Sequence, residues 1–240
     1  MMYLKVSNSL TDKIRWMVVI WKFVEVGAGI FCLAFIVERF ITPTYCAFNT
    51  QYLDWKWFIK SYIKAYISGI LFLIIGHYVL LHAWMNAWAE MLRFGDRLFY
   101  KDWWNCTTYR EYYRTWNIVV HNWLYTYVYK DMYEIVVPGK RTLSSAMVFF
   151  ISAIFHELVI AFSLRFFYPV LFILFGIIGY IFFFIRKYTS NVFMQLGLGF
   201  GMSIMFNLYS MEACARWNNC PSHPNYYLDL FIPRSWSCLK

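Results

Sequence analysis

The sequence predicts an all-α, polytopic transmembrane domain, and three observations lead to this prediction. Of the 240 residues, 61% are hydrophobic, and the mean hydropathy is +0.46, which exceeds what a soluble domain of this length carries. Long apolar runs recur along the chain, with charged and aromatic segments between them. No internal repeat, low-complexity tract or linker divides the chain, so residues 1–240 are expected to form a single membrane-embedded domain.

Four segments are long and apolar enough to cross a bilayer, and a fifth is richer in glycine. A spanning helix needs about 20 predominantly apolar residues. The four segments are Trp16 to Val37, Tyr62 to Leu92, Leu143 to Leu164 and Pro169 to Ile185. The fifth, Val192 to Met211, contains three glycines that would let it pack closely against neighbouring helices. The N-terminus shows no convincing secretory signal, so insertion would use an internal span.

The formal net charge of +9 fits membrane topology better than nucleic-acid binding, because the basic residues are scattered between apolar runs. Cytosolic loops of membrane proteins carry an excess of lysine and arginine. The loop after the second predicted span is therefore assigned to the cytosol. Its basic residues are Arg93, Arg97, Lys101, Arg110 and Arg114.

A polar stripe is predicted on the aromatic segment from Tyr112 to Tyr133, which is too polar for a lipid-facing span. On a continuous helix, a set spaced by three, four and four residues would share one face, with Trp116 beside it. The set is Arg114, Asn117, His121 and Tyr125. This face either lines a channel or consists of polar groups that satisfy one another, and the pattern leaves both interpretations open.

His156 lies inside the apolar run from Leu143 to Leu164, which is about 22 residues or roughly 33 Å as a helix. An ionisable group at this depth is costly unless it is paired or lines a wet cavity, and Glu157 follows it directly. A neutral imidazole can accept a proton from a hydroxyl that attacks an acyl donor, and an amide such as Asn117 can steady the developing oxyanion. A structural or proton-pathway role for His156 remains the alternative from the residues alone.

Other catalytic arrangements find little support. No GxSxG elbow occurs, and Cys106 has no neighbouring base in the sequence, so direct transfer without an acyl-enzyme is favoured. No phosphate-binding loop, dinucleotide fingerprint or cysteine-rich metal motif occurs. The histidines are too dispersed to predict a metal site, so we expect neither a metal nor a bound cofactor.

The segment FYKDWWN, from Phe99 to Asn105, resembles the FYxDWWN signature of the membrane-bound O-acyltransferases. The segments TWNIVVHNW and SAIFHE resemble the active-site segments of the same family, and the order and spacing agree from about Ile14 to Cys238. Within the family, YYRTWN, LRFFYPVLF and PRSWSC are similar to the sterol O-acyltransferase branch. The diacylglycerol branch shares FYxDWWN and the His-Glu pair, and it remains the alternative.

The resemblance implies a multi-pass enzyme of the endoplasmic-reticulum membrane that moves a long-chain acyl group from acyl-CoA to a sterol hydroxyl. It implies His156 as general base, Asn117 as its partner and Trp116 beside the thioester. The CoA side would draw on Tyr113, Arg114, His121, Tyr125, Tyr129, Arg141 and Ser152. Arg141 stands where relatives often carry lysine, and Asn122 replaces an aspartate common in relatives. The expected partners are acyl-CoA as co-substrate, the sterol, membrane lipid and further copies in a homo-oligomer, with no nucleic acid.

The chain resembles the C-terminal half of such enzymes, whose N-terminal helices help to enclose the reaction chamber. Two expectations therefore stay open: a fragment of a longer protein, and a truncated non-catalytic partner of a full-length relative. A third hypothesis, an ion or proton path in a transporter, follows from the polar stripe. Cys220 and Cys238 bracket a polar loop. The resemblance implies that this loop is luminal and that the two cysteines are paired. From the residues alone, a disulfide and two free thiols are both possible.

Overall fold

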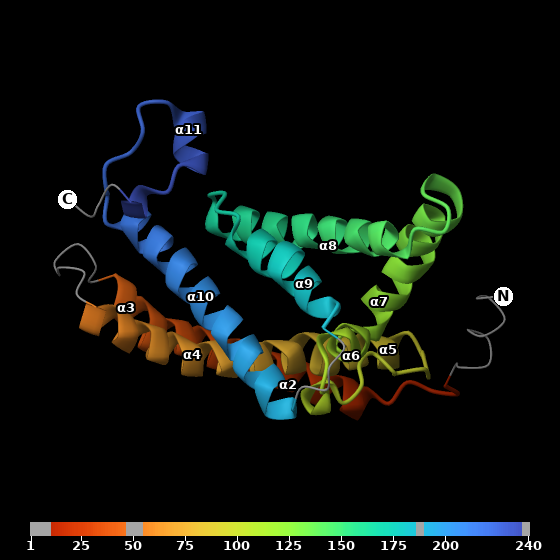
Figure 1. The fold of residues 1–240 in the computed structure, drawn as a ribbon. Coiled ribbons are helices and arrows are strands. Elements are labelled where there is room, and N and C mark those ends of the chain that lie inside the picture. The colour runs from red at the N-terminus through yellow and green to blue at the C-terminus, as the bar shows by residue number, and fades with distance from the viewer. Residues whose placement is uncertain (1–10, 47–54, 186–189, 237–240) are drawn as a thin grey trace.

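The computed structural model describes residues 11–46, 55–185 and 190–236, which form helices and their connections. Figure 1 shows two groups of helices, one lower and one higher in the view, with the blue helix of the lower group rising obliquely toward the upper left. One group holds α2 (Trp16–Ile36), α4 (Trp55–His77) and α10 (Asn191–Trp217), and the other holds α8 (Arg141–Leu164). The second group also includes η7 (Phe172–Gly179) and α9 (Tyr180–Phe183). The all-α architecture predicted from the apolar runs is confirmed.

Four helices are long and apolar enough to cross a membrane: Trp16–Tyr45, Trp55–Met91, Arg141–Leu164 and Asn191–Trp217. The prediction for Pro169 to Ile185 is wrong in length, because the apolar helix there covers only Phe172–Phe183. Arg165 ends the preceding helix in the left-handed region at φ 61°, and Pro169 allows a helix to begin only after it. This segment is therefore a short helix packed against α8.

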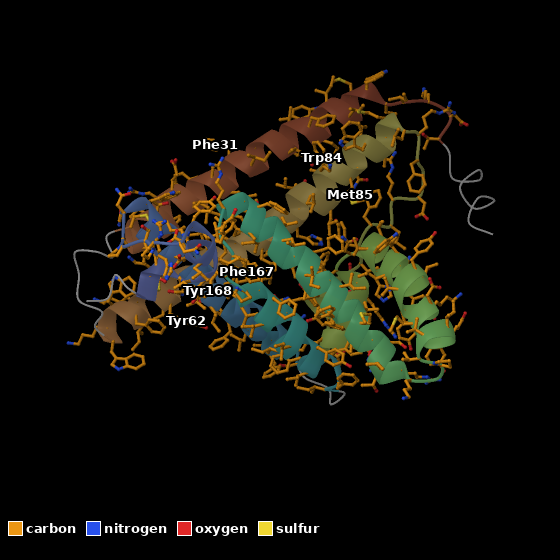
Figure 2. The ribbon with its side chains drawn as sticks, turned by 90° about the horizontal axis from the view of Figure 1, so that it is seen from above. Phe31, Tyr62, Trp84, Met85, Phe167 and Tyr168 are labelled. Carbon is orange, nitrogen blue, oxygen red and sulfur yellow. A yellow bond between two sulfur atoms is a disulfide. The ribbon has the colours of Figure 1, made fainter. Side chains whose placement is uncertain are left out.

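The first two spans form a hairpin in which both helices contain π-helical turns. After α2, the chain continues through η1 (Val37–Ile41) into α3 (Thr42–Tyr45). After α4, it continues through η3 (Tyr78–Trp84) into α5 (Met85–Met91). A Cβ at Gly29 would overlap the side chain of Val79, so the glycine lets α2 and η3 approach closely. In Figure 2, Phe31 lies on the outer edge of this hairpin, while Trp84 and Met85 belong to its second helix.

Helix α10 packs along α4 through small and polar side chains. The Ser203 hydroxyl donates to the carbonyl of Tyr62 at 2.8 Å, and the Tyr45 hydroxyl donates to Oδ1 of Asn207 at 2.6 Å. These bonds satisfy polar groups that lie between the helices, as the membrane interior requires.

The ends of the bundle differ in chemistry. At the end that carries the basic loop, the Glu90 carboxylate is fully buried and accepts hydrogen bonds from the guanidinium groups of Arg15 and Arg97. At the opposite end, a disulfide joins Cys46 to Cys214. Cys220 is also disulfide-bonded, and its predicted partner Cys238 lies outside the described residues. Disulfides persist in oxidising compartments, so this end suits the luminal side and the basic loop suits the cytosolic side.

A short helix, α11 (Tyr226–Phe231), caps the disulfide end. The backbone N–H of Phe167, just after α8, donates to the carbonyl of Leu230 at 3.0 Å. Figure 2 shows Phe167 and Tyr168 beside this part of the chain. The cap therefore connects the end of α8 to the end of α10.

Candidate active site

His156 lies on α8 with its side chain exposed on the helix surface. Its Nδ1 lies 2.7 Å from the carbonyl oxygen of Ser152, one turn earlier. Because a carbonyl can only accept, Nδ1 carries the hydrogen of this bond, which leaves Nε2 as the ring nitrogen that faces a ligand. The imidazole also stacks on Phe175 from η7, with ring centroids 5.0 Å apart and an interplanar angle of 29°. This arrangement presents Nε2 as a proton acceptor.

Asn117 lies at a break between two helices, which corrects the predicted continuous stripe. Helix α6 (Tyr109–Thr115) ends before it, and α7 (Ile118–Leu124) begins after it. Asn117 adopts an extended conformation at φ −145°, and its Oδ1 accepts a hydrogen bond from the N–H of Val120 at 3.1 Å. Asparagine is among the best N-cap residues, and the cap interrupts the helix that periodicity predicted. The Asn117 amide NH₂ donates to none of the described residues, so it is available to a ligand.

Trp116 belongs to an aromatic cluster that the sequence did not predict. Its ring lies 4.3 Å from that of His77 and 4.7 Å from that of Trp103, measured between centroids. The Nε2–H of His77 donates to the backbone carbonyl of Trp116 at 3.2 Å. Trp103 lies in η4 (Trp103–Asn105), within the FYKDWWN segment, and is buried. The cluster therefore holds the backbone of Trp116, the residue directly before Asn117.

Tyr113 connects this cluster to the histidine helix. Its ring packs edge-on against Phe149 of α8 at 5.0 Å and against Phe175 at 5.6 Å. Phe175 in turn stacks on His156, so a continuous row of rings joins α6 to the imidazole. Burial raises the pKa of the Tyr113 hydroxyl above its usual value, which keeps it neutral. Among the hydrogen bonds of the described residues, none joins His156 directly to Asn117.

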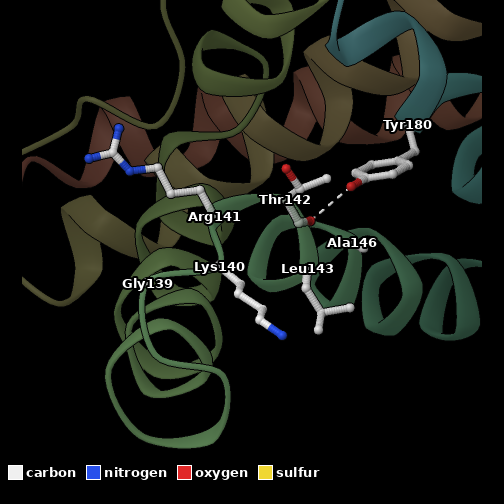
Figure 3. A pocket seen from close by; sticks show the side chains of 7 residues that line it. All are labelled: Gly139, Lys140, Arg141, Thr142, Leu143, Ala146 and Tyr180. Carbon is white, nitrogen blue, oxygen red and sulfur yellow. Dashed lines mark hydrogen bonds between the residues drawn. The ribbon is translucent and has the colours of Figure 1, made fainter.

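A cleft of about 590 Å³ opens at the start of α8 (Figure 3). Lys140 and Arg141 are among its lining residues, and Figure 3 shows their charged ends pointing in different directions. The Tyr180 hydroxyl donates to the carbonyl of Thr142 at 2.8 Å. The remaining lining residues are Gly139, Leu143 and Ala146. An open cleft with two cations suits a phosphate-bearing ligand.

Three tyrosines stack in a ladder along η5 (Tyr125–Tyr129) and η6 (Met132–Val136), which precede this cleft. The rings of Tyr125 and Tyr129 lie 5.4 Å apart at 13°, and those of Tyr129 and Tyr133 lie 5.9 Å apart at 6°. Nearly parallel rings offer a flat face to a planar group.

A second cleft of about 460 Å³ is lined by Lys101, Arg114 and His121, with Asn122 beside them. Burial lowers the pKa of His121, and the nearby charge of Arg114 adds to this effect, although a hydrogen bond with Asn122 opposes it. His121 is therefore neutral near pH 7, and the positive charge of this cleft comes from the lysine and the arginine. The predicted site residues thus lie in several places: Arg141 lines the first cleft, Arg114 and His121 line the second, and Tyr125 and Tyr129 belong to the tyrosine ladder.

The described residues contain no group of three or more His, Cys, Asp or Glu side chains that could hold a metal ion. The signals that could have found the unpredicted parts differ. An asparagine directly before the apolar residues from Ile118 onward is a helix-start signal in the sequence, whereas the contacts of His77 with Trp116 and Trp103 join segments distant in sequence.

The model of the membrane-bound O-acyltransferase family matches residues 3–215. Sterol O-acyltransferase 1 of Mus musculus is 42% identical over 237 residues, which cover 95% of this chain and 43% of that protein. Sterol O-acyltransferase 2 of Homo sapiens is 39% identical over 233 residues, which cover 95% of this chain and 44% of that protein. The chain thus spans less than half the length of the curated relatives it matches. On the family match and these identities, the chain belongs to the membrane-bound O-acyltransferase family.

Proposed function

We propose that this chain carries the catalytic half of an acyl-CoA-dependent sterol O-acyltransferase of the endoplasmic-reticulum membrane. The observation that carries the proposal is the His156 imidazole, whose Nδ1–H donates to Ser152 O at 2.7 Å, while Nε2 has no hydrogen-bond partner among the described residues. The relatives named above as sterol O-acyltransferases support the sterol as acceptor.

In this mechanism, Nε2 of His156 takes the proton of the sterol hydroxyl as its oxygen attacks the thioester carbonyl carbon. The carbon–sulfur bond then breaks, and the proton passes to the departing thiolate to give CoA and a sterol ester. The free amide NH₂ of Asn117 donates to the oxyanion that develops on the carbonyl, and Trp116 covers the thioester. No acyl-enzyme forms, because the hydroxyl attacks directly.

The two cationic clefts account for the CoA moiety. Arg141 and Lys140 in the first cleft and Arg114 in the second offer charge to its phosphates. The stacked rings of Tyr125 and Tyr129 offer a face to the adenine. We also assign to the CoA side His121, which lines the second cleft, Tyr113, which contacts Phe175, and Ser152, whose carbonyl accepts from His156.

The side chain of His156 is exposed in this chain, so the site around it is not enclosed by the described residues. Acyl transfer needs a site that excludes water, since water would compete with the sterol for the acyl group. We propose that segments homologous to the N-terminal parts of the relatives, or further copies in a homo-oligomer, cover this face. A non-catalytic role beside a full-length relative is the second candidate, and the same exposure favours it.

The test is CoA release from oleoyl-CoA by the purified chain in detergent, with cholesterol and diacylglycerol compared as acceptors. The measurement is repeated after co-expression with the N-terminal half of a sterol O-acyltransferase. Release that requires cholesterol, in either preparation, supports the proposal. Release with diacylglycerol alone would reassign the acceptor, and no release from either folded preparation would favour the non-catalytic role.

A further inference from the structure

Glu157, the residue after His156, is only 2% exposed and faces the opposite side of α8 from solvent. The single hydrogen of the Tyr209 hydroxyl, from α10, is shared between the two carboxylate oxygens of Glu157 at 2.8 and 3.0 Å, and the carboxylate also accepts from the backbone N–H of Phe172 at 2.9 Å. The oxygen of the Tyr209 hydroxyl also accepts from the N–H of Leu171 at 3.1 Å. One carboxylate and one hydroxyl therefore join α8, α10 and the start of η7.

None of the ion pairs among the described residues involves Glu157. A buried carboxylate without a cation is costly unless hydrogen bonds satisfy it. Here the donors are a hydroxyl and a backbone N–H in the first turn of η7, where the helix dipole favours a negative charge. The three elements are consequently held to each other, since separating any of them leaves the carboxylate short of a donor.

Helix η7 then runs antiparallel along α8 toward the first cleft. A Cβ at Gly176 would lie 2.8 Å from the Cβ of Ala153, so the missing side chain sets the two helices close together. Farther along, the Tyr180 hydroxyl bonds to Thr142 of α8. Phe175, which stacks on the imidazole of His156, lies between the bonded start of η7 and this close contact.

We infer that Glu157 and Tyr209 are positioning residues for His156, acting through η7 and Phe175. Glu157 holds the start of η7, η7 holds Phe175 against one face of the imidazole, and Tyr209 anchors the arrangement to α10. Helix α8, which carries His156, is thereby positioned by α10, which packs along α4. The inference rests on the proposed function for its kinetic consequence, while its structural consequence, the shielding of His156, stands without it.

The primary variant is Tyr209→Phe, which keeps the ring and removes the hydroxyl. Loss of a hydrogen bond to a charged group is expected to lower kcat about tenfold or more, with the KM for acyl-CoA unchanged within about twofold. The matched control is Tyr45→Phe, which removes another buried hydroxyl bonded to a side chain of α10, Oδ1 of Asn207 at 2.6 Å. This control should destabilise the fold to a similar extent and leave kcat within about twofold.

The second readout is the rate at which diethyl pyrocarbonate modifies His156, followed by mass spectrometry, which needs no enzymatic activity. Tyr209→Phe should raise this rate because Phe175 no longer covers one face of the ring. Phe175→Leu, which leaves the carboxylate and its donors intact, should raise it as well. Glu157→Gln retains one acceptor oxygen and should fall between the wild type and Glu157→Ala in both readouts.

The outcomes distinguish failure of the positioning inference from failure of the proposed function. If the wild type transfers no acyl group but Tyr209→Phe speeds modification of His156, the positioning holds and the proposed function fails. If the wild type is active and Tyr209→Phe matches Tyr45→Phe in both kcat and modification rate, the positioning inference is overturned. Should Tyr209→Phe fail to fold, Glu157→Gln and Phe175→Leu decide the question, and unchanged modification rates in both would overturn it.

Discussion

Substitution of Asn117 separates the two tasks that the structure gives this side chain. Its Oδ1 caps α7 by accepting the N–H of Val120 at 3.1 Å, while its NH₂ group has no described partner. Asn117→Asp keeps an oxygen for the cap and removes the NH₂ donor. Asn117→Ala removes both functions.

The magnitudes follow from these contacts. Loss of the cap in Asn117→Ala should cost about 1 kcal/mol, or a decrease in Tm of about 2–4 °C for a chain of this size. Asn117→Asp should retain the wild-type Tm, because a carboxylate at a helix start is also favoured by the dipole. Both variants should lose about 10²- to 10³-fold in kcat, as expected when one donor to an oxyanion is removed.

The assay is sterol ester formation from labelled oleoyl-CoA, together with thermal unfolding in the same detergent. The control is Asn225→Asp, because Asn225 also caps a helix through its Oδ1, which accepts from Tyr227 N at 2.9 Å and from Leu228 N at 3.4 Å at the start of α11. This control should leave kcat unchanged. Activity of Asn117→Asp within about threefold of the wild type would refute the assignment of the amide as the oxyanion donor.

Three further perturbations test the packing, the disulfide and the charged cap. Gly179→Ala should lower Tm, because the added Cβ would lie 2.5 Å from the Tyr113 hydroxyl. Adding Tyr113→Phe to this variant should restore part of the loss. An unchanged Tm in Gly179→Ala alone would contradict this contact. Cys46→Ser should lower Tm in non-reducing buffer as much as Cys214→Ser does, and the double variant should lose no more than either, whereas additive losses would argue against the disulfide. Hydrogen bonds with Arg234 are the main cause that lowers the pKa of Asp229. The ionised carboxylate therefore contributes stability above an ordinary aspartate pKa of about 3.9, and this contribution is lost as the pH falls below that value. Proteolysis of residues 226–236 should therefore accelerate below about pH 4 in the wild type and be fast at every pH in Asp229→Asn; pH-independent protection of the variant would contradict the prediction.

The long helices were predictable because apolar length alone identifies them. The run Leu143 to Leu164 differs by two residues from the observed α8, Arg141–Leu164, and it placed His156 on that helix. The same reasoning overestimated Pro169 to Ile185, where the helix covers only Phe172–Phe183. Hydropathy measures the solvent preference of a segment and is insensitive to backbone breaks.

The candidate site was predicted residue by residue, and its arrangement was not. Periodicity placed Arg114, Asn117 and His121 on one helix, but the N-cap at Asn117 divides it, and a polar residue directly before Ile118 is the signal that favours this break. The contacts of Trp116 with His77 join segments 39 residues apart, and the disulfide joins cysteines separated by 168 residues. Pattern along the chain carries no information on such distances, so only the folded structure could supply them.

We propose His156 as the general base of acyl transfer to a sterol. The most direct measurement is the kcat of sterol ester formation by His156→Gln in a preparation that is active as wild type, with membrane insertion and Tm measured on the same sample. Glutamine keeps a polar side chain of similar length but cannot accept the proton, so kcat should fall by about 10²- to 10⁴-fold while insertion and Tm stay at wild-type values. A kcat within about threefold of the wild type would contradict the account, because the hydroxyl proton would then have another acceptor.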